Sequence, residues 1–323
     1  MVPKYINEFC MGLNFYYWTL ESGLGEDDQK KTFAYKINLD NLSLIKNVWK
    51  IDKQLIVVTH GYISMYDDQG AYSIKNTYAF NYPDQYNIIT LGWIVEYHQF
   101  LDVLRDCEHV GHALSHFLIK LVKLKLIMPS NIHMIGHNLG AHVLGACGAN
   151  FYELTDMKIG RITGLNPKGP ISIYPWEKWN YLKKTLQKDD AEFVDLIHTA
   201  KAKIFPSTTG HVVFYPNGGK TCQPGCEYEI DDYNYDLLNK KKISELFCSD
   251  ARSYEFYKDS IIYKSAFVSE LYNPKTKILI KYENKPVKSN RMGHYVNKEK
   301  HGNFYLNTEE KSPFDFQWYI PRG

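Results

Sequence analysis

Short apolar runs alternate with longer segments of helical periodicity along the middle of the chain. Leu101–Leu126 carries apolar residues at helical spacing, and Pro129 ends this pattern. Five runs, rich in branched apolar residues, are short enough to be buried strands. They are Leu55–Val58, Tyr86–Thr90, Ile132–Ile135, Arg161–Leu165 and Phe193–Ile197. This alternation predicts an α/β fold, in which helices flank a mostly parallel central sheet.

The C-terminal part of the chain has a different pattern. Lys277–Lys281 and Asn303–Leu306 have the composition of strands, and a polar, lysine-rich stretch separates them. We expect both to extend the sheet as antiparallel strands at its far end. Because no linker or internal repeat interrupts the chain, residues 1–323 are predicted to form a single domain.

One strand is followed directly by the sequence Gly136-His137-Asn138-Leu139-Gly140. In the related motif G-x-S-x-G, a sharp turn between strand and helix presents a serine nucleophile. The two glycines allow strand and helix to approach closely, and asparagine accepts the positive φ of such a turn better than most residues. However, an amide cannot become a nucleophile as a hydroxyl can. The motif therefore predicts the sharp turn but no nucleophile at position 138.

Further motifs resemble the pancreatic-lipase family, which includes vertebrate lipases, insect phospholipases A1 and the dipteran yolk proteins. The resemblance is densest between Tyr86 and Ser260. The motifs are Thr59–Tyr62, Tyr86–Trp93, Gly164–Pro170, Asp190–His198, Gly210–Gly219, Gln223–Cys226 and Cys248–Ser253. The resemblance implies an α/β-hydrolase fold and favours an arthropod source. It also implies that no C-terminal β-sandwich domain is present, because the chain stops where that domain begins in vertebrate lipases.

In that family a serine, an aspartate and a histidine form the catalytic triad. The resemblance places Asn138 at the serine position, Asn166 in the Gly-Leu-Asp-Pro motif and Asp250 in the Cys-Ser-His motif. It therefore implies that the nucleophile, the orienting carboxylate and the proton-transferring imidazole are all replaced. We expect a catalytically inactive lipase homologue with no catalytic residues.

Other residues are weaker candidates for chemistry. His137, His198 and His211 stand in family-like motifs where packing is the simpler interpretation, and Ser249 has no evident base. Oxyanion-hole donors are main-chain N–H groups, which survive when side chains change. The resemblance assigns them to Tyr62 and Leu139, so these two residues are expected to line a ligand-binding notch.

The six cysteines allow 15 pairings if all are oxidised. The resemblance implies a Cys226–Cys248 disulfide that closes the loop 227–247, which in lipases is the lid over the active site. Such a loop either covers a groove with its apolar residues inward or is a solvated surface loop. Cys10–Cys107 is expected as a second bridge. Since no second Cys/His pair follows Cys222 and Cys226 at zinc-finger distance, neither a metal nor another cofactor is predicted.

Charge and composition restrict the partners and the compartment. The net charge of +2 gives no indication of nucleic-acid binding, and no apolar run approaches the roughly 18–20 residues of a transmembrane helix. Met1–Lys4 begins no secretory signal, and we expect a mature form whose signal was replaced by a start methionine. The cysteines and the glycosylation sequon at Asn41 favour a secreted, extracellular protein.

Several functions agree with an inactive lipase homologue. The leading expectation is a secreted storage protein, as the yolk proteins are within this family, or a structural protein. An alternative is a carrier that holds a lipid or another apolar small molecule in the former acyl groove. A further alternative is a weak esterase or phospholipase with an unconventional site. Each is compatible with a homo-oligomer.

Overall fold

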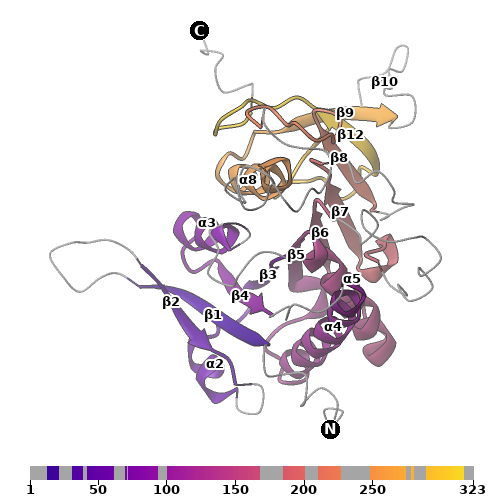
Figure 1. Cartoon of the computed structure of the whole chain (residues 1–323). Helices are drawn as coiled ribbons and strands as arrows, with labels where there is room; N and C mark the ends of the chain where they lie inside the picture. Colours follow the sequence, from indigo (N-terminus) through magenta and orange to yellow (C-terminus); the bar gives the residue numbers. More distant parts are fainter. Residues whose placement is uncertain are drawn as a thin grey trace, which may run out of the picture.

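The strands of the chain form one twelve-stranded sheet, in the order β10-β9-β12-β8-β7-β6-β5-β3-β4-β1-β2, with β11 paired to β9 (Figure 1). The computed structural model describes residues 13–21, 31–38, 42–61, 70, 72–93, 100–167, 185–200, 210–226, 248–273, 278–279 and 289–315. The strands are β1 Asn14–Glu21, β2 Lys31–Lys36, β3 Gln54–Thr59, β4 Tyr86–Gly92, β5 Ile132–His137, β6 Arg161–Leu165, β7 Phe193–Ile197, β8 Val212–Pro216, β9 Val268–Asn273, β10 Ile278–Leu279, β11 Ser289–Arg291 and β12 Gly302–Leu306.

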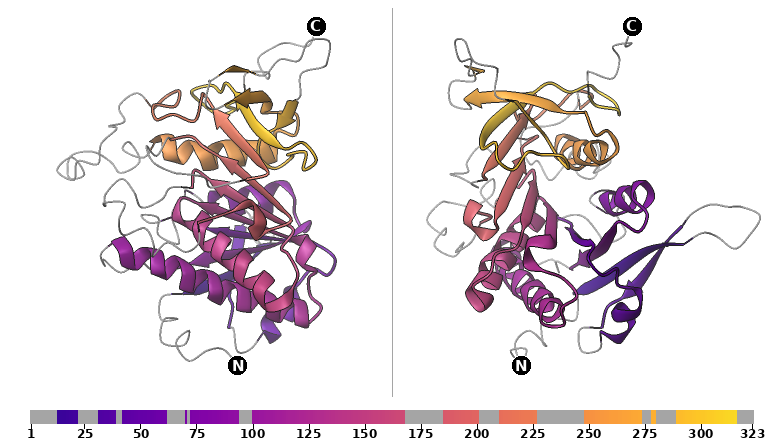
Figure 2. Two further views of the ribbon diagram at one scale, coloured as in Figure 1. Left: turned by 90° about the vertical axis from the view of Figure 1, so that its right-hand side faces the viewer. Right: turned by 180° about the vertical axis from the view of Figure 1, so that it is seen from behind.

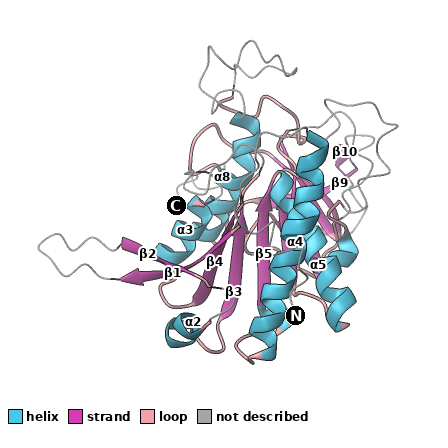
Figure 3. Cartoon of the chain, turned by 60° about the horizontal axis from the view of Figure 1, so that its bottom comes forward, coloured by secondary structure: helices cyan, strands magenta, loops and turns pink. Residues whose placement is uncertain are grey.

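The helices cover both faces of this sheet. They are α2 Ser43–Val48, α3 Ser73–Asn81, α4 Phe100–Lys123, α5 Leu139–Thr155 and α8 Cys248–Ile262, with short 3-10 turns at Pro129–Asn131 and Lys188–Asp190. Figure 3 shows α4 and α5 in front of the sheet and α3 and α8 behind it. Leu118 of α4 and Leu144 of α5 belong to one apolar core, whereas Tyr78 of α3 and Phe256 of α8 belong to the other.

The middle of the sheet confirms the predicted architecture. β3 to β8 run parallel, and β5, β6 and β7 are buried along their whole length, as expected for strands covered on both faces. All five predicted strands form, and the predicted helix is α4. β1 and β2, which the apolar pattern did not reveal, add an antiparallel pair at the β4 edge.

The C-terminal strands require a correction. β10 is antiparallel to β9, as expected for the region 277–281. The prediction for Asn303–Leu306 is wrong on one side, because β12 runs parallel to β8 and antiparallel to β9. The physical reason is that α8 carries the chain past the next position in the sheet, so that β12 later fills the gap between β8 and β9. Figure 2 shows these strands together at the end of the molecule farthest from β1 and β2.

The cysteines agree only in part with the prediction. Cys226 and Cys248 form a disulfide, which confirms the first bridge. The expected Cys10–Cys107 bridge does not form in the structure: Cys107 is a free, buried cysteine on α4, and Cys10 lies outside the described residues. The side chain of Cys107 packs into the apolar core on the α4 and α5 face, where burial raises the pKa of its thiol. None of the described helices is long and apolar enough to cross a membrane.

Candidate functional site

The turn between β5 and α5 has the conformation that its motif predicts. Asn138 has φ 54° and ψ −119°, outside the main regions allowed to residues with a side chain. Such a conformation costs on the order of 1–3 kcal/mol and persists only where the surroundings fix it. Here the main-chain N–H of Asn138 donates to the carbonyl of Leu165 at 2.9 Å, which ties the turn to the end of β6.

Two glycines make room for this turn. A Cβ at Gly140 would lie 2.3 Å from the carbonyl oxygen of His60, and a Cβ at Gly61 would lie 2.6 Å from the Cβ of Asn138. Neither position therefore accepts a side chain without movement of the main chain. The close contact places the side chain of Asn138 against the His60–Gly61 segment that follows β3.

The side chain of Asn138 bonds to its own neighbour. Its Oδ1 accepts a hydrogen bond from the main-chain N–H of Leu139 at 2.7 Å, and thereby caps α5. This N–H is the oxyanion-hole donor that the resemblance assigned to Leu139. Within the folded chain it is already engaged, while the second expected donor, Tyr62, lies outside the described residues.

Asn166 follows β6 directly and joins two further segments. Its Oδ1 accepts hydrogen bonds from the main-chain N–H groups of Thr199 at 3.2 Å and Ala200 at 3.1 Å. Its Nδ2 donates to the carboxylate of Asp250. Asn166 is fully buried and Asp250 nearly so. The structure therefore brings Asn166 and Asp250 into direct contact, although 84 positions separate them in sequence.

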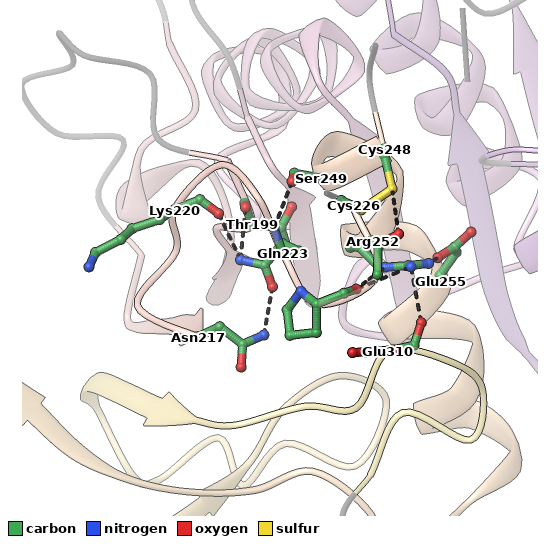
Figure 4. Close-up of a disulfide and its surroundings, with 12 residues drawn as sticks. Thr199, Asn217, Lys220, Gln223, Cys226, Cys248, Ser249, Arg252, Glu255 and Glu310 are labelled. Atoms are coloured by element: carbon green, nitrogen blue, oxygen red, sulfur yellow. Dashed lines mark hydrogen bonds and ion pairs between the residues drawn. A yellow bond between two sulfur atoms is a disulfide. The ribbon is translucent and has the colours of Figure 1, made fainter. Parts of the chain in front are cut away.

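The start of α8, where Asp250 lies, is held by two contacts with the segment Gln223–Cys226 (Figure 4). The disulfide joins Cys248 to Cys226, and Ser249 Oγ accepts from the main-chain N–H of Gln223 at 3.0 Å. Gln223 Nε2 donates to the carbonyl oxygens of Thr199, Pro216 and Lys220 at 2.9–3.0 Å. Gln223 was not singled out from the sequence, although its position in the family-like motif Gln223-Pro-Gly-Cys226 was a usable signal.

His60 is held between main-chain groups near the turn. Its Nδ1 lies 2.7 Å from the carbonyl oxygen of Gly61, and its Nε2 lies 3.2 Å from the main-chain nitrogen of Trp93. Nδ1 therefore carries the proton and donates it, whereas Nε2 accepts. The ring also stacks on Trp93, with centroids 5.5 Å apart. With both nitrogens used by the main chain, His60 serves the packing of the strand ends.

The three histidines considered from the sequence lie in packing environments. His137 is buried and meets Tyr254 edge to face. His198 follows β7 and stacks on Tyr215, and burial lowers its pKa to about 4. His211 precedes β8, at the opposite edge of the parallel strands from Asn138, and its Nδ1 accepts from the N–H of Val194.

Two of the three side chains that the sequence singled out at this edge are amides, whereas Asp250 carries a carboxylate. Asn138 and Asn166 are amides, which exchange no proton at ordinary pH and supply neither a nucleophile nor a base. Among the described residues, no three histidine, cysteine, aspartate or glutamate side chains are grouped so that they could hold a metal ion. The loop 227–247 and the Asn41 sequon lie outside the described residues.

Comparison with known proteins identifies the family. A model of the lipase family matches residues 25–314. Human pancreatic lipase-related protein 3 is 34% identical over 251 residues, which are 71% of this chain and 50% of that protein. The pancreatic triacylglycerol lipase of Sus scrofa is 31% identical over 312 residues, covering 89% of this chain and 65% of that protein. The chain thus spans half to about two thirds of the length of these relatives.

Among solved structures, an α/β-hydrolase from a deep-sea metagenome library, MGS-M1, aligns with a TM-score of 0.33 and 18% identity. The alignment covers 60% of this chain and 72% of that protein, and it is too distant to support any argument about the site. The lipase match, in contrast, extends over most of the chain and agrees with its mostly parallel, helix-covered sheet. This chain belongs to the pancreatic-lipase family of α/β-hydrolases.

Proposed function

We propose that this chain is a catalytically inactive member of its family. The observation that carries the proposal is the set of residues at three positions where active relatives need a triad: Asn138 in the β5–α5 turn, Asn166 after β6 and Asp250 at the start of α8. The Asn166–Asp250 hydrogen bond supports this assignment, because it joins the positions at which an aspartate would orient a histidine.

A second observation, at the expected oxyanion hole, also supports inactivity. Leu139, whose N–H would stabilise a tetrahedral oxyanion, donates to Asn138 Oδ1 instead. A substrate carbonyl would have to displace this side chain before it could use the donor. The hydrogen bond from Leu139 to Asn138 therefore supports the proposal that this chain does not hydrolyse esters.

The proposal is tested by assays of triglyceride, phospholipid and short-chain ester hydrolysis. We expect no turnover above that of a heat-inactivated sample, and no labelling of the protein by a fluorophosphonate probe. Turnover that the same covalent probe abolishes would show a serine nucleophile elsewhere in the chain and would contradict the proposal.

Reversion provides a sharper test of the three assignments. Asn138→Ser alone is expected to remain inactive, because Asp250 stands at the position from which a histidine would accept the proton of the new hydroxyl. Asn138→Ser, Asn166→Asp and Asp250→His together restore all three members and are the only combination with the required chemistry. Robust activity of the single variant would show that Asp250 does not occupy the histidine position.

For the biological role, we propose a secreted storage protein of the yolk-protein kind or a structural protein, built as one domain over residues 1–323. The disulfide supports an oxidising, extracellular compartment. The occupied oxyanion site favours a role without substrate over residual esterase or phospholipase activity. Abundance of the protein in eggs or hemolymph would support storage.

The competing role is that of a carrier for a lipid or another apolar molecule. It depends on a groove beneath the loop 227–247 and is distinguished by one experiment. Protein purified from its native source is extracted with organic solvent, and the extract is analysed by mass spectrometry against a matched control protein. An empty extract agrees with storage, whereas one apolar molecule per chain would establish the carrier role.

A further inference from the structure

We infer that Asn138 modifies itself: in the folded protein its side-chain amide cyclises onto the main-chain nitrogen of Leu139 and is then hydrolysed to a carboxylate. The inference rests on the ψ angle of Asn138 and on the contact between its amide and Leu139. It is independent of the proposed inactivity, since the reaction needs only these two residues and water.

The main-chain conformation of Asn138 favours closure of a five-membered ring with Leu139. At ψ −119° the Cβ of Asn138 is nearly eclipsed with the nitrogen of Leu139, so that N, C, Cα, Cβ and Cγ can close a five-membered ring with little further rotation. In regular helices and strands, ψ turns Cβ away from the next nitrogen. Asn138 Oδ1 lies only 2.7 Å from this nitrogen, which shows that the side chain already folds back over it.

The reaction balances without any reagent other than water. Solvent base removes the N–H proton of Leu139, and the nitrogen forms a bond to Asn138 Cγ. Nδ2 takes up a proton from the solvent, which replaces the one removed from Leu139. The bond between Cγ and Nδ2 then breaks, and Nδ2 leaves as ammonia, which gives a succinimide. Water then opens the ring, either at Cγ to give aspartate or at the main-chain carbonyl to give isoaspartate. The net change is replacement of the amide by a carboxylate with release of ammonia.

The surroundings favour both the reaction and its product. The fold holds Asn138 Oδ1 2.7 Å from the Leu139 nitrogen, which lowers the entropic cost of bringing this nitrogen and Cγ together. Asn138 is half-buried, so water reaches its side chain. A carboxylate formed there would cap the N-terminus of α5, a helix of 17 residues whose dipole stabilises negative charge at this end.

A second asparagine in the chain provides an internal comparison. Asn217 precedes Gly218, which has no side chain to crowd the attacking nitrogen, so Asn217 is the more reactive of the two in an unfolded chain. In the folded protein its Nδ2 donates to Gln223 and Thr308 at 2.7 and 2.8 Å, and its Oδ1 accepts from the N–H of Thr308 at 3.0 Å. These bonds hold its amide away from Gly218.

The test compares the folded and the urea-unfolded protein at the same mildly alkaline pH and temperature. Samples taken over time are digested, and mass spectrometry follows the conversion of amide to carboxylate in the peptides that contain Asn138 and Asn217. We expect Asn138 to react about tenfold faster or more in the folded protein than in the unfolded one, because only the fold aligns the reacting atoms. Asn217 is expected to show the opposite order.

The variant Asn138→Gln serves as a control, because its longer side chain must close a six-membered ring and should leave the Leu139 peptide unmodified. Hydroxylamine added during incubation should trap the succinimide of the native protein at position 138. The inference is overturned if Asn138 reacts no faster in the folded protein than in urea. This result would leave the proposed inactivity untouched, because that proposal is tested by turnover and not by amide conversion.

Discussion

Both ends of the parallel strands carry buried polar groups, and among the described residues a buried ion pair lies toward the amino ends. At the carboxyl ends, Asn166 donates to Asp250, and an amide fills the turn at Asn138. Toward the amino ends, Arg161 forms a bidentate ion pair with Asp195, with nitrogen–oxygen distances of 2.8 and 2.9 Å. The first group lies where we propose that a catalytic triad has been replaced, whereas the second lies within the sheet.

The amino-end group also contains a histidine, His294, whose pKa is strongly lowered. Arg161 donates to the carbonyl oxygens of Gly293 and His294, and the His294 ring bonds to Tyr78 at 2.8 Å. Burial, assisted by the charge of Arg161, lowers the pKa of His294 to about 3. A shifted pKa often marks a functional site. Here the lowered pKa belongs to a histidine that is hydrogen-bonded where the C-terminal segment packs on the sheet. A shifted pKa alone therefore does not identify a catalytic residue in this chain.

The largest expected effect comes from breaking the amino-end ion pair. Asp195→Ala leaves the buried guanidinium of Arg161 without its carboxylate and should lower the free energy of unfolding by about 3–5 kcal/mol. Denaturant titration measures this loss. As a control, Asp84→Asn removes the charge of the exposed partner of Lys50 and keeps a residue that tolerates the φ of 60° at this position, so it should cost at most about 1 kcal/mol. Equal losses in the two variants would mean that the buried pair has no special role.

At positions 166 and 250, near the carboxyl ends, two negative charges should be destabilising, whereas a negative charge beside a histidine should not. Asn166→Asp would place a second carboxylate against Asp250, and we expect a coupling of about 0.5–3 kcal/mol in the destabilising direction. The repulsion raises the pKa of the new carboxyl, so the variant should lose stability as the pH rises through that value. Adding Asp250→His should recover stability, since the pair then has opposite charges or a hydrogen bond.

Unfolding titrations of the wild type, both single variants and the double variant at acid and neutral pH complete this cycle. If Asn166→Asp is as stable as the wild type at neutral pH, the contact between positions 166 and 250 does not form in solution.

Sequence reasoning predicted the turn between β5 and α5, because a short motif with strict local geometry marks it. It also singled out Asn166 and Asp250, which the structure brings into contact. The positive φ of Asn138 and the glycines around it follow from the turn itself. The amino-end group was missed, because Arg161, Asp195 and His294 meet only through strand register and the return of the C-terminal segment. No local pattern encodes such contacts. The same limit explains the wrong direction assigned to Asn303–Leu306, whose neighbours in the sheet are set by chain crossing.

A smaller effect is expected from the pH dependence of the amino-end group. The pKa of His294 is lowered in the folded protein, so between about pH 3 and the unfolded value of about 6.5 the unfolded chain binds more protons. Stability should therefore fall as the pH drops below about 6.5, by up to about 1.4 kcal/mol per pH unit for this one group. Denaturant titrations between about pH 4.5 and about pH 7.5, which lie on either side of the unfolded pKa, measure the slope.

The variant His294→Gln keeps a hydrogen-bonding side chain beside Tyr78 but cannot take up the proton, and it should flatten the slope. His301→Gln, at an exposed position, should leave the slope nearly unchanged. An undiminished slope in His294→Gln would assign the acid sensitivity to other groups, such as His133, whose pKa burial also lowers.

The smallest effect concerns the strained turn. Asn138→Gly should change the free energy of unfolding by only a few tenths of a kcal/mol, because glycine accepts φ 54° without steric cost and this gain offsets the lost cap. Asn138→Ala loses the cap and keeps the strain, so it should cost about 1–2 kcal/mol. Glycine is therefore better than alanine at position 138. At exposed Glu153, inside the same helix, the alanine variant should instead be more stable than the glycine variant by about 0.5–1 kcal/mol. Denaturant unfolding of the glycine and alanine variants at positions 138 and 153 measures both differences. A preference for alanine at both positions would show that the turn is not held at positive φ.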